Sequence, residues 1–289
     1  MTEIEQYVAP SSLEQAAEYL QRSGEVTILA GGTDLMPQSQ GGRLKIKRTL
    51  MNIQHIPELK GIVLDGGAIR IGALATITEI MQSELVKKHL PILIEACDHF
   101  ASDQIRNAAT LGGNVCNASP AGDMLVPLLV LDAEVELASK PNGSLARRRM
   151  PLAEFFVGPG KTRCGPAELL AGLRIGLPSA NHYARFFKFG TRPALDISAI
   201  SIGIAGTLTN GALLQVRVAF GAVAPVPMRA PRTERALEGR RLDPATIEAV
   251  ADVARDEVTP IDDIRATAWY RKELIHNITR RMLAHVAQT

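Results

Sequence analysis

Thr110-Leu111-Gly112-Gly113-Asn114 and Ala30-Gly31-Gly32-Thr33-Asp34-Leu35 are two diglycine segments that decide the fold of this chain. Glycine tolerates positive φ and has no Cβ to block the approach of a ligand. Successive backbone N–H groups in such a turn point the same way and form a nest for phosphate oxygens. Thr33 and Thr110 add hydroxyl donors. The two segments together predict a cradle for a pyrophosphate.

The known phosphate-binding motifs are absent from both segments. The chain has no G-x-x-x-x-G-K-[ST], and the first segment is not G-x-G-x-x-G, which disfavours a mononucleotide kinase and a Rossmann fold. Each diglycine alone fits a tight turn. Together, with Asn114, Asn117 and Asp123 around the second, they favour a cofactor, and Asn117 and Asp123 suit sugar hydroxyls. Asp123 also fits the N-cap of a short buried helix expected at Met124–Leu131.

Length and composition limit the classes of protein to which this chain can belong. A chain of 289 residues predicts about two domains. An apolar content of 46% is typical of a globular protein, and the longest apolar run, Met124–Leu131, is far below the roughly 20 residues that span a bilayer. The N-terminal segment has no basic region followed by an apolar stretch, so we expect a cytoplasmic protein. A net charge of +2 disfavours a nucleic-acid binder.

Charge is concentrated in one segment. Ten Lys and Arg residues against two Asp and Glu residues lie between Lys140 and Arg192. This segment fits a phosphate-bearing ligand or an acidic partner, and it fits a solvated basic surface equally well. Arg147-Arg148-Arg149 is expected in a solvated turn, with a role at an interface as the alternative.

The spacing of reactive side chains indicates neither a catalytic group nor a metal site on this chain. Cys97, Cys116 and Cys164 lie far apart without a C-x-x-C pair, which excludes a disulfide framework and an iron–sulfur or zinc site. The sequence also lacks H-E-x-x-H and any apparent Ser/His/Asp arrangement.

Residue periodicity predicts two lobes in the first part of the chain. The first begins with a Ser11-Ser12-Leu13-Glu14 capping box. The second begins near Pro57 and includes an irregular stretch from Ala101 to Gly122. The other elements expected are a helix from Leu13, strands Val26–Leu29 and Thr49–Ile53, paired strands Gly61–Leu64 and Ala68–Gly72, helices Thr76–Leu85 and Leu90–Phe100, and a strand Ala133–Leu137 with one solvent-facing side.

The chain changes character near Pro178. Two strands, Ile200–Leu208 and Leu213–Val223, are joined across Thr209-Asn210-Gly211, which is a hairpin signal. An antiparallel sheet followed by helices predicts a separate α+β domain. The helices expected are Thr233–Glu238, Pro244–Glu257 and Thr267–His285.

These motifs resemble the flavin-binding medium subunit of the molybdenum hydroxylases, the family of xanthine dehydrogenase and carbon monoxide dehydrogenase. The resemblance rests on Ile28–Leu35 and on Gln104-Ile105-Arg106-Asn107-x-x-Thr110-Leu111-Gly112-Gly113-Asn114-x-x-x-Ala118-x-Pro120-x-x-Asp123. Glu168–Pro178 resembles the entry to the family's C-terminal domain. Lys188-x-x-x-Arg192-x-x-x-Asp196-Ile197 resembles the signature that follows, so the resemblance covers nearly the whole chain.

The resemblance implies an α+β fold in two domains. Residues 1–177, with lobes of about 1–56 and 57–177, would be a two-lobed FAD-binding domain of the vanillyl-alcohol-oxidase (PCMH) type. Residues 178–289 would be a C-terminal α+β domain of the CO dehydrogenase flavoprotein type, with FAD extended between the two domains. Asp123 would contact sugar or ribityl hydroxyls, Leu170 the flavin or adenine, and Lys188 the isoalloxazine edge. The implied cofactor-binding residues are Leu29, Ala30, Gly31, Gly32, Thr33, Asp34, Leu35, Thr110, Leu111, Gly112, Gly113, Asn114, Asn117, Asp123, Leu170 and Lys188.

The resemblance also implies a function. The chain would be the FAD-binding electron-transfer subunit of a heterotrimeric molybdenum hydroxylase, in a dimer of heterotrimers. A small partner would carry two [2Fe–2S] clusters, a large partner would carry molybdopterin, and an external acceptor would take the electrons. Two alternatives stay open: a self-sufficient PCMH-type oxidase or reductase with its own substrate pocket, and a non-redox nucleotide-binding scaffold subunit.

Overall fold

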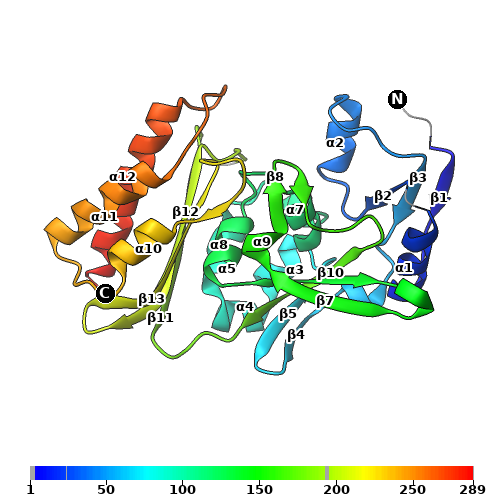
Figure 1. Cartoon of the computed structure of the whole chain (residues 1–289), viewed down its shortest axis with the longest axis horizontal. Coiled ribbons are helices and arrows are strands. Elements are labelled where there is room, and N and C mark those ends of the chain that lie inside the picture. The colour runs from blue at the N-terminus through cyan, green and yellow to red at the C-terminus, as the bar shows by residue number, and fades with distance from the viewer. Residues whose placement is uncertain (1–3, 24, 193–194, 289) are drawn as a thin grey trace.

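The N-terminal lobe is a small parallel sheet covered by one helix. The computed structural model describes residues 4–23, 25–192 and 195–288. The sheet has the order β1-β3-β2, and α1 packs on it through the core around Leu13 and Met51 (Figure 1). The Ser12 hydroxyl, not Ser11, caps α1 by accepting the N–H of Gln15, so the predicted capping box was one residue out of register. The elements of this lobe are β1 Gln6–Val8, α1 Leu13–Arg22, β2 Val26–Leu29, α2 Leu35–Gln40, β3 Thr49–Asn52 and the 3₁₀ turn η1 Pro57–Leu59.

The second lobe is built on a five-stranded antiparallel sheet of order β4-β5-β10-β6-β7. The predicted pairing of the strand at Gly61–Leu64 with the strand at Ala68–Gly72 is confirmed. The expected solvent-facing side of the strand after residue 133 is wrong, because α1 packs against β6 and the four central residues of this strand are buried. Residues 147–149 do not form a solvated turn but lie in edge strand β7. The strands are β4 Ile62–Asp65, β5 Ala68–Gly72, β6 Glu134–Ser139, β7 Ala146–Pro151 and β10 Leu169–Gly176.

Short helices cover this sheet. The predicted capping box of Thr76 and Glu79 is confirmed at the start of α3. The stretch 101–122 is not irregular, because it contains α6 and α7. Met124, and not Asp123, is the N-cap of α8. The remaining elements are α3 Ile77–Gln82, α4 Glu84–His89, α5 Pro91–Asp98, α6 Asp103–Arg106, α7 Leu111–Asn117, α8 Leu125–Val130, η2 Pro141–Gly143, α9 Leu152–Phe155, β8 Phe156–Gly158 and β9 Lys161–Thr162.

The C-terminal part is an antiparallel sheet of order β11-β12-β13-β14 with three helices on its outer face (Figure 1). The predicted hairpin is confirmed, and Asn210 and Gly211 at its turn both have positive φ. The predicted cap Asp243 accepts the N–H of Thr246 at the start of α11. The elements are β11 His182–Phe189, β12 Ile200–Thr209, β13 Ala212–Gly221, β14 Met228–Arg229, α10 Pro231–Leu237, α11 Pro244–Glu257 and α12 Ala268–Val286.

Two glycines in this sheet allow the second lobe to pack closely against it. A Cβ on Gly203 of β12 or Gly221 of β13 would come within about 3 Å of Val126, because α8 packs directly on these strands. The absence of side chains at these positions lets the helix approach the sheet closely. None of the helices in the described ranges is both long and apolar enough to cross a bilayer.

Ion pairs within the chain neutralise much of the positive charge of the basic segment 140–192. Arg148 holds Glu168 through two nitrogens, at 2.6 and 2.7 Å, and lowers the pKa of that carboxyl. Most of the other cations of the segment also contact carboxylates, so much of its positive charge is balanced within the chain. These pairs are Lys140 with Glu14 and Glu18, Arg147 and Arg149 with Glu136, Arg174 with Asp65, Arg185 with Glu95, and Lys188 with Asp123.

Candidate functional site

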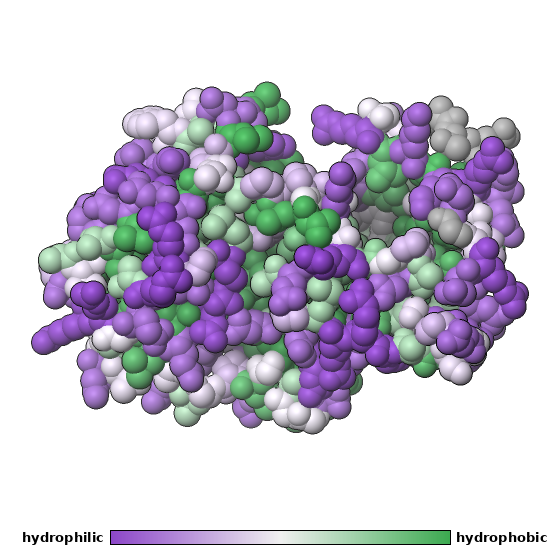
Figure 2. All heavy atoms as spheres, viewed as in Figure 1, coloured by the Kyte–Doolittle hydropathy of each residue, from purple (hydrophilic) through white to green (hydrophobic). Residues whose placement is uncertain are grey.

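The two predicted glycine segments line one cavity of about 390 Å³ between the first two lobes. The first segment comes from the end of β2 and the second from α7. The surface is hollowed between the lobe that carries α2 and the rest of the molecule (Figure 2). The structure brings most of the predicted site residues to this cavity: Ala30, Gly31, Gly32, Thr33, Asp34, Leu35, Thr110, Gly112, Gly113, Asn114, Asn117 and Leu170.

The first segment presents a row of free backbone donors. The N–H groups of Gly31–Leu35 donate to no group in the described part of the chain. Gly32 has a φ of +71°, and a Cβ on Gly31 would lie 1.9 Å from the carbonyl oxygen of Ala108. Both positions therefore require glycine, one for its backbone conformation and one for close packing. Unpaired N–H groups of consecutive residues are the donors that an anionic ligand needs.

The second segment does not form the expected nest. Gly112 and Gly113 lie in the first turn of α7, and neither has positive φ. Their N–H groups are already bonded, to Ala73 O at 2.9 Å and to the Thr110 hydroxyl at 3.0 Å. This wall instead offers a side chain, because the buried Oδ1 of Asn114 has no hydrogen-bond partner among the described residues. A buried polar atom without a partner is rare and indicates a missing donor.

Side chains from distant parts of the chain hold the first segment in place. Gln54 Nε2 donates to the carbonyl of Ala30 at 2.6 Å and fixes the start of the first segment. Asn117 donates to Asp34 and accepts from Gln38 Nε2 at 3.2 Å, so it joins the two walls. No local sequence pattern indicates Gln38 or Gln54, because their partners are set by tertiary contacts.

The structure does not bring the other predicted residues to this cavity. Leu29 lies in β2 and Leu111 is fully buried in the core. Asp123 and Lys188 form a buried ion pair with 2.8 Å between Oδ2 and Nζ, and the Ser198 hydroxyl donates to the same carboxylate at 3.2 Å. Burial raises the pKa of Asp123 although Lys188 opposes this shift. The pair ties the start of α8 to β11.

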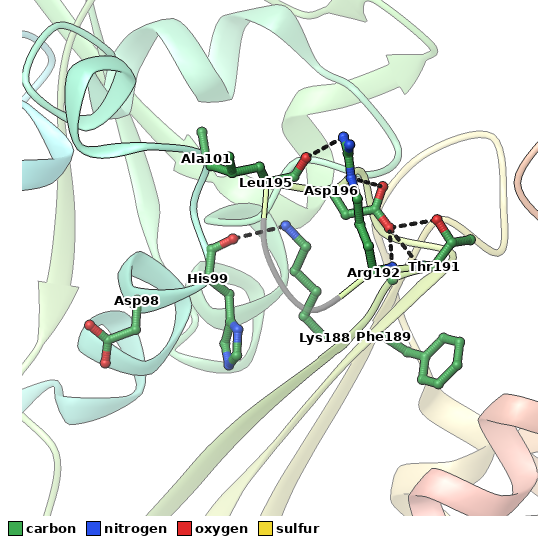
Figure 3. A pocket seen from close by; sticks show the side chains of 10 residues that line it. Asp98, His99, Ala101, Lys188, Phe189, Thr191, Arg192, Leu195 and Asp196 are labelled. Carbon is green, nitrogen blue, oxygen red and sulfur yellow. Dashed lines mark hydrogen bonds and ion pairs between the residues drawn. The ribbon is translucent and has the colours of Figure 1, made fainter.

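A second cavity of about 390 Å³ lies beside this pair. Lys188 Nζ also donates to the carbonyl of His99 at 3.0 Å (Figure 3). Phe100 lines the first cavity, and the next residue in the chain, Ala101, lines the second. Asp196 closes the far side, where it accepts from the Thr191 hydroxyl at 2.9 Å. No group of three His, Cys, Asp or Glu residues suited to a metal occurs in the described ranges.

Comparison with known proteins covers nearly the whole chain. Residues 2–179 match the FAD binding domain in molybdopterin dehydrogenase, and residues 185–286 match the CO dehydrogenase flavoprotein C-terminal domain. The chain is 32% identical to the xanthine dehydrogenase FAD-binding subunit of Escherichia coli O157:H7, over 98% of this chain and 96% of that one. It is 30% identical to the glyceraldehyde dehydrogenase medium chain of Sulfolobus acidocaldarius, with 97% and 98% covered. The structure of carbon monoxide dehydrogenase from Hydrogenophaga pseudoflava, lacking the Mo-pyranopterin moiety, matches with a TM-score of 0.90 at 29% identity, covering 96% and 94%.

Lys188→Met is expected to lower the free energy of unfolding by about 3–5 kcal/mol, because it leaves the Asp123 carboxylate buried without its partner. The double variant D123N/K188M removes both charges and is expected to recover most of this loss. Urea unfolding of the two variants and the wild type measures the difference. Equal stability of the single and double variants would contradict this reading of the pair.

Proposed function

Because this chain belongs to the family of FAD-binding medium subunits of the molybdenum hydroxylases, we propose that it passes electrons from the [2Fe–2S] clusters of a partner subunit through FAD to an external acceptor. As a member of this family, the chain is an FAD-binding subunit of an oxidoreductase. The observation that carries the site is the row of free N–H groups at Gly31–Leu35, in a cavity that is also lined by Asn114, whose buried Oδ1 has no partner among the described residues.

The residues present fit FAD. The free N–H groups of Gly31–Leu35 would hold the diphosphate, because they supply several donors without a counter-charge that must be desolvated. The Oδ1 of Asn114 needs a donor, and a sugar hydroxyl supplies one. Leu170 would provide an apolar contact on the wall formed by β10. Leu29 and Leu111 would support these segments from behind.

The flavin end of the cofactor would lie toward the second cavity. The adjacent residues Phe100 and Ala101 line the two cavities, so an extended cofactor would pass from one to the other along this segment. Lys188 would then hold a positive charge near the ring, oriented by Asp123 and by the carbonyl of His99. Bound FAD supplies a carrier that exchanges electrons singly or in pairs, while the protein supplies binding, orientation and electrostatics.

The assembly that we propose has three kinds of chain. The relatives include medium chains of dehydrogenases, and the matched carbon monoxide dehydrogenase structure is described as lacking the Mo-pyranopterin moiety of its molybdenum cofactor. We propose a small [2Fe–2S] subunit and a large molybdopterin subunit as partners, in a cytoplasmic dimer of heterotrimers. Within this chain, residues 1–177 would hold FAD and residues 178–289 would cover it.

Isolation of the tagged chain from its own cells tests the proposal. We expect FAD, a [2Fe–2S] subunit and a molybdopterin subunit to co-purify. The separated [2Fe–2S] subunit, reduced with dithionite and desalted, is expected to bleach the flavin absorbance of the FAD-loaded chain under anaerobic conditions. The oxidised [2Fe–2S] subunit is the control. A chain that carries FAD but accepts no electrons from the reduced subunit would contradict the proposal.

Gly31→Ala is expected to reduce FAD affinity by at least about tenfold, because the added methyl would displace the first segment from Ala108 and move its free N–H groups. Gly176→Ala is the matched control, since a Cβ there meets nothing within 4 Å. Titration of the FAD-free chains with FAD, followed by quenching of flavin fluorescence, measures both. Equal affinities for the two variants would show that the close approach is not needed.

A further inference from the structure

We propose that Asn117 is a positioning residue for FAD, which holds the Asp34 carboxylate away from the free N–H groups of Gly31–Leu35. The inference rests on the proposed FAD site. It differs from the sequence-based expectation that Asn117 itself contacts a sugar hydroxyl. Its basis is the hydrogen-bond network that joins Asp34, Asn117 and Gln38 at the cavity wall.

The network connects two lobes. Asn117 is the last residue of α7, and its Nδ2 donates to Oδ2 of Asp34 in the first glycine segment. Its Oδ1 accepts from Nε2 of Gln38 at 3.2 Å, on α2. The end of α7 is itself held, because Ala118 adopts positive φ and its carbonyl accepts the N–H of Gly160 at 3.1 Å. Both polar atoms of the Asn117 amide therefore point toward the N-terminal lobe from a fixed position.

Asp34 has no alternative partner on its own helix. It is the N-cap residue of α2, a position where an Asp side chain usually accepts the N–H of the second or third helical residue. Here the third residue is Pro37, which has no N–H, and the N–H of Met36 is bonded to Gly32 O at 3.1 Å. The carboxylate makes no cap bond, and Asn117 is its partner in the described part of the chain.

The position of this charge matters for an anionic ligand. Asp34 belongs to the segment whose N–H groups would hold the diphosphate, and like charges at close range repel strongly outside bulk water. A carboxylate without a partner can rotate toward these N–H groups and compete with the phosphate oxygens for them. The Asn117 amide prevents this by binding the carboxylate at the cavity wall. It also fixes the segment to α7, which orders the donors before FAD binds.

Exchange of the two side chains tests the inference. N117D places two carboxylates against each other and is expected to lower FAD affinity by about tenfold or more, the cost of losing a hydrogen bond to a charged group. The double variant D34N/N117D puts the amide at position 34 and the carboxylate at position 117, where it still accepts from Gln38. We expect it to bind FAD within about threefold of the wild type, since the network is restored. D34N alone keeps an acceptor for Asn117 and is expected to bind at least as tightly as the wild type.

The pH dependence separates this role from a structural one. The loss of affinity in N117D is expected to shrink as the pH is lowered, because protonation of one carboxyl removes the repulsion. If N117D does not fold, as judged by circular dichroism, N117A and D34A/N117A replace it. N117A should then bind weakly, and removal of the carboxylate in the double variant should restore binding.

The outcomes distinguish this inference from the proposed function. A double variant D34N/N117D that binds FAD no better than N117D would overturn the positioning role and favour direct contact of Asn117 with the cofactor. An N117D variant that binds like the wild type would also overturn it. A wild-type chain that binds no FAD would instead contradict the proposed function itself.

Discussion

The approach of Gly31 to the carbonyl of Ala108 is the contact on which the rest of the site depends. A Cβ at this position would lie 1.9 Å from that oxygen, so only glycine lets the first segment lie against the chain that leads into α7. Two hydrogen bonds hold the segment on either side, from Gln54 to Ala30 and from Asn117 to Asp34. The result is a fixed row of N–H donors at the boundary of two lobes, which a flexible glycine loop alone would not provide.

The walls of the cofactor site play different parts. The first segment supplies backbone donors. In α7, by contrast, the N–H groups of the first turn are already bonded to Ala73 and Thr110, so this wall offers the side-chain amides of Asn114 and Asn117 instead. The buried ion pair of Asp123 and Lys188 connects β11, in the C-terminal part of the chain, to the start of α8 in the second lobe. A cofactor that spans the two cavities would therefore contact all three parts of the chain.

Short sequence patterns correctly predicted the elements that are determined by interactions between residues close in the sequence. The hairpin around Asn210 and the Asp243 cap of α11 follow from short-range turn and capping preferences. The helix at Leu111–Asn117 was missed because two glycines lower helix propensity, and the bonds of its first turn to residues 73 and 75 are invisible in the sequence. The presence of both glycine segments in one site was predictable from their motifs. The roles within it were not, because they depend on which N–H groups the fold leaves unpaired.

Amide hydrogen exchange, measured residue by residue in the FAD-free and FAD-loaded chain, tests the central claim most directly. The N–H groups of Gly31–Leu35 should exchange rapidly without FAD and become protected when it binds. Those of Leu111–Gly113 should be protected in both states, because the protein already bonds them. Protection that appears on FAD binding at residues 111–113 but not at 31–35 would show that the diphosphate lies on the other wall.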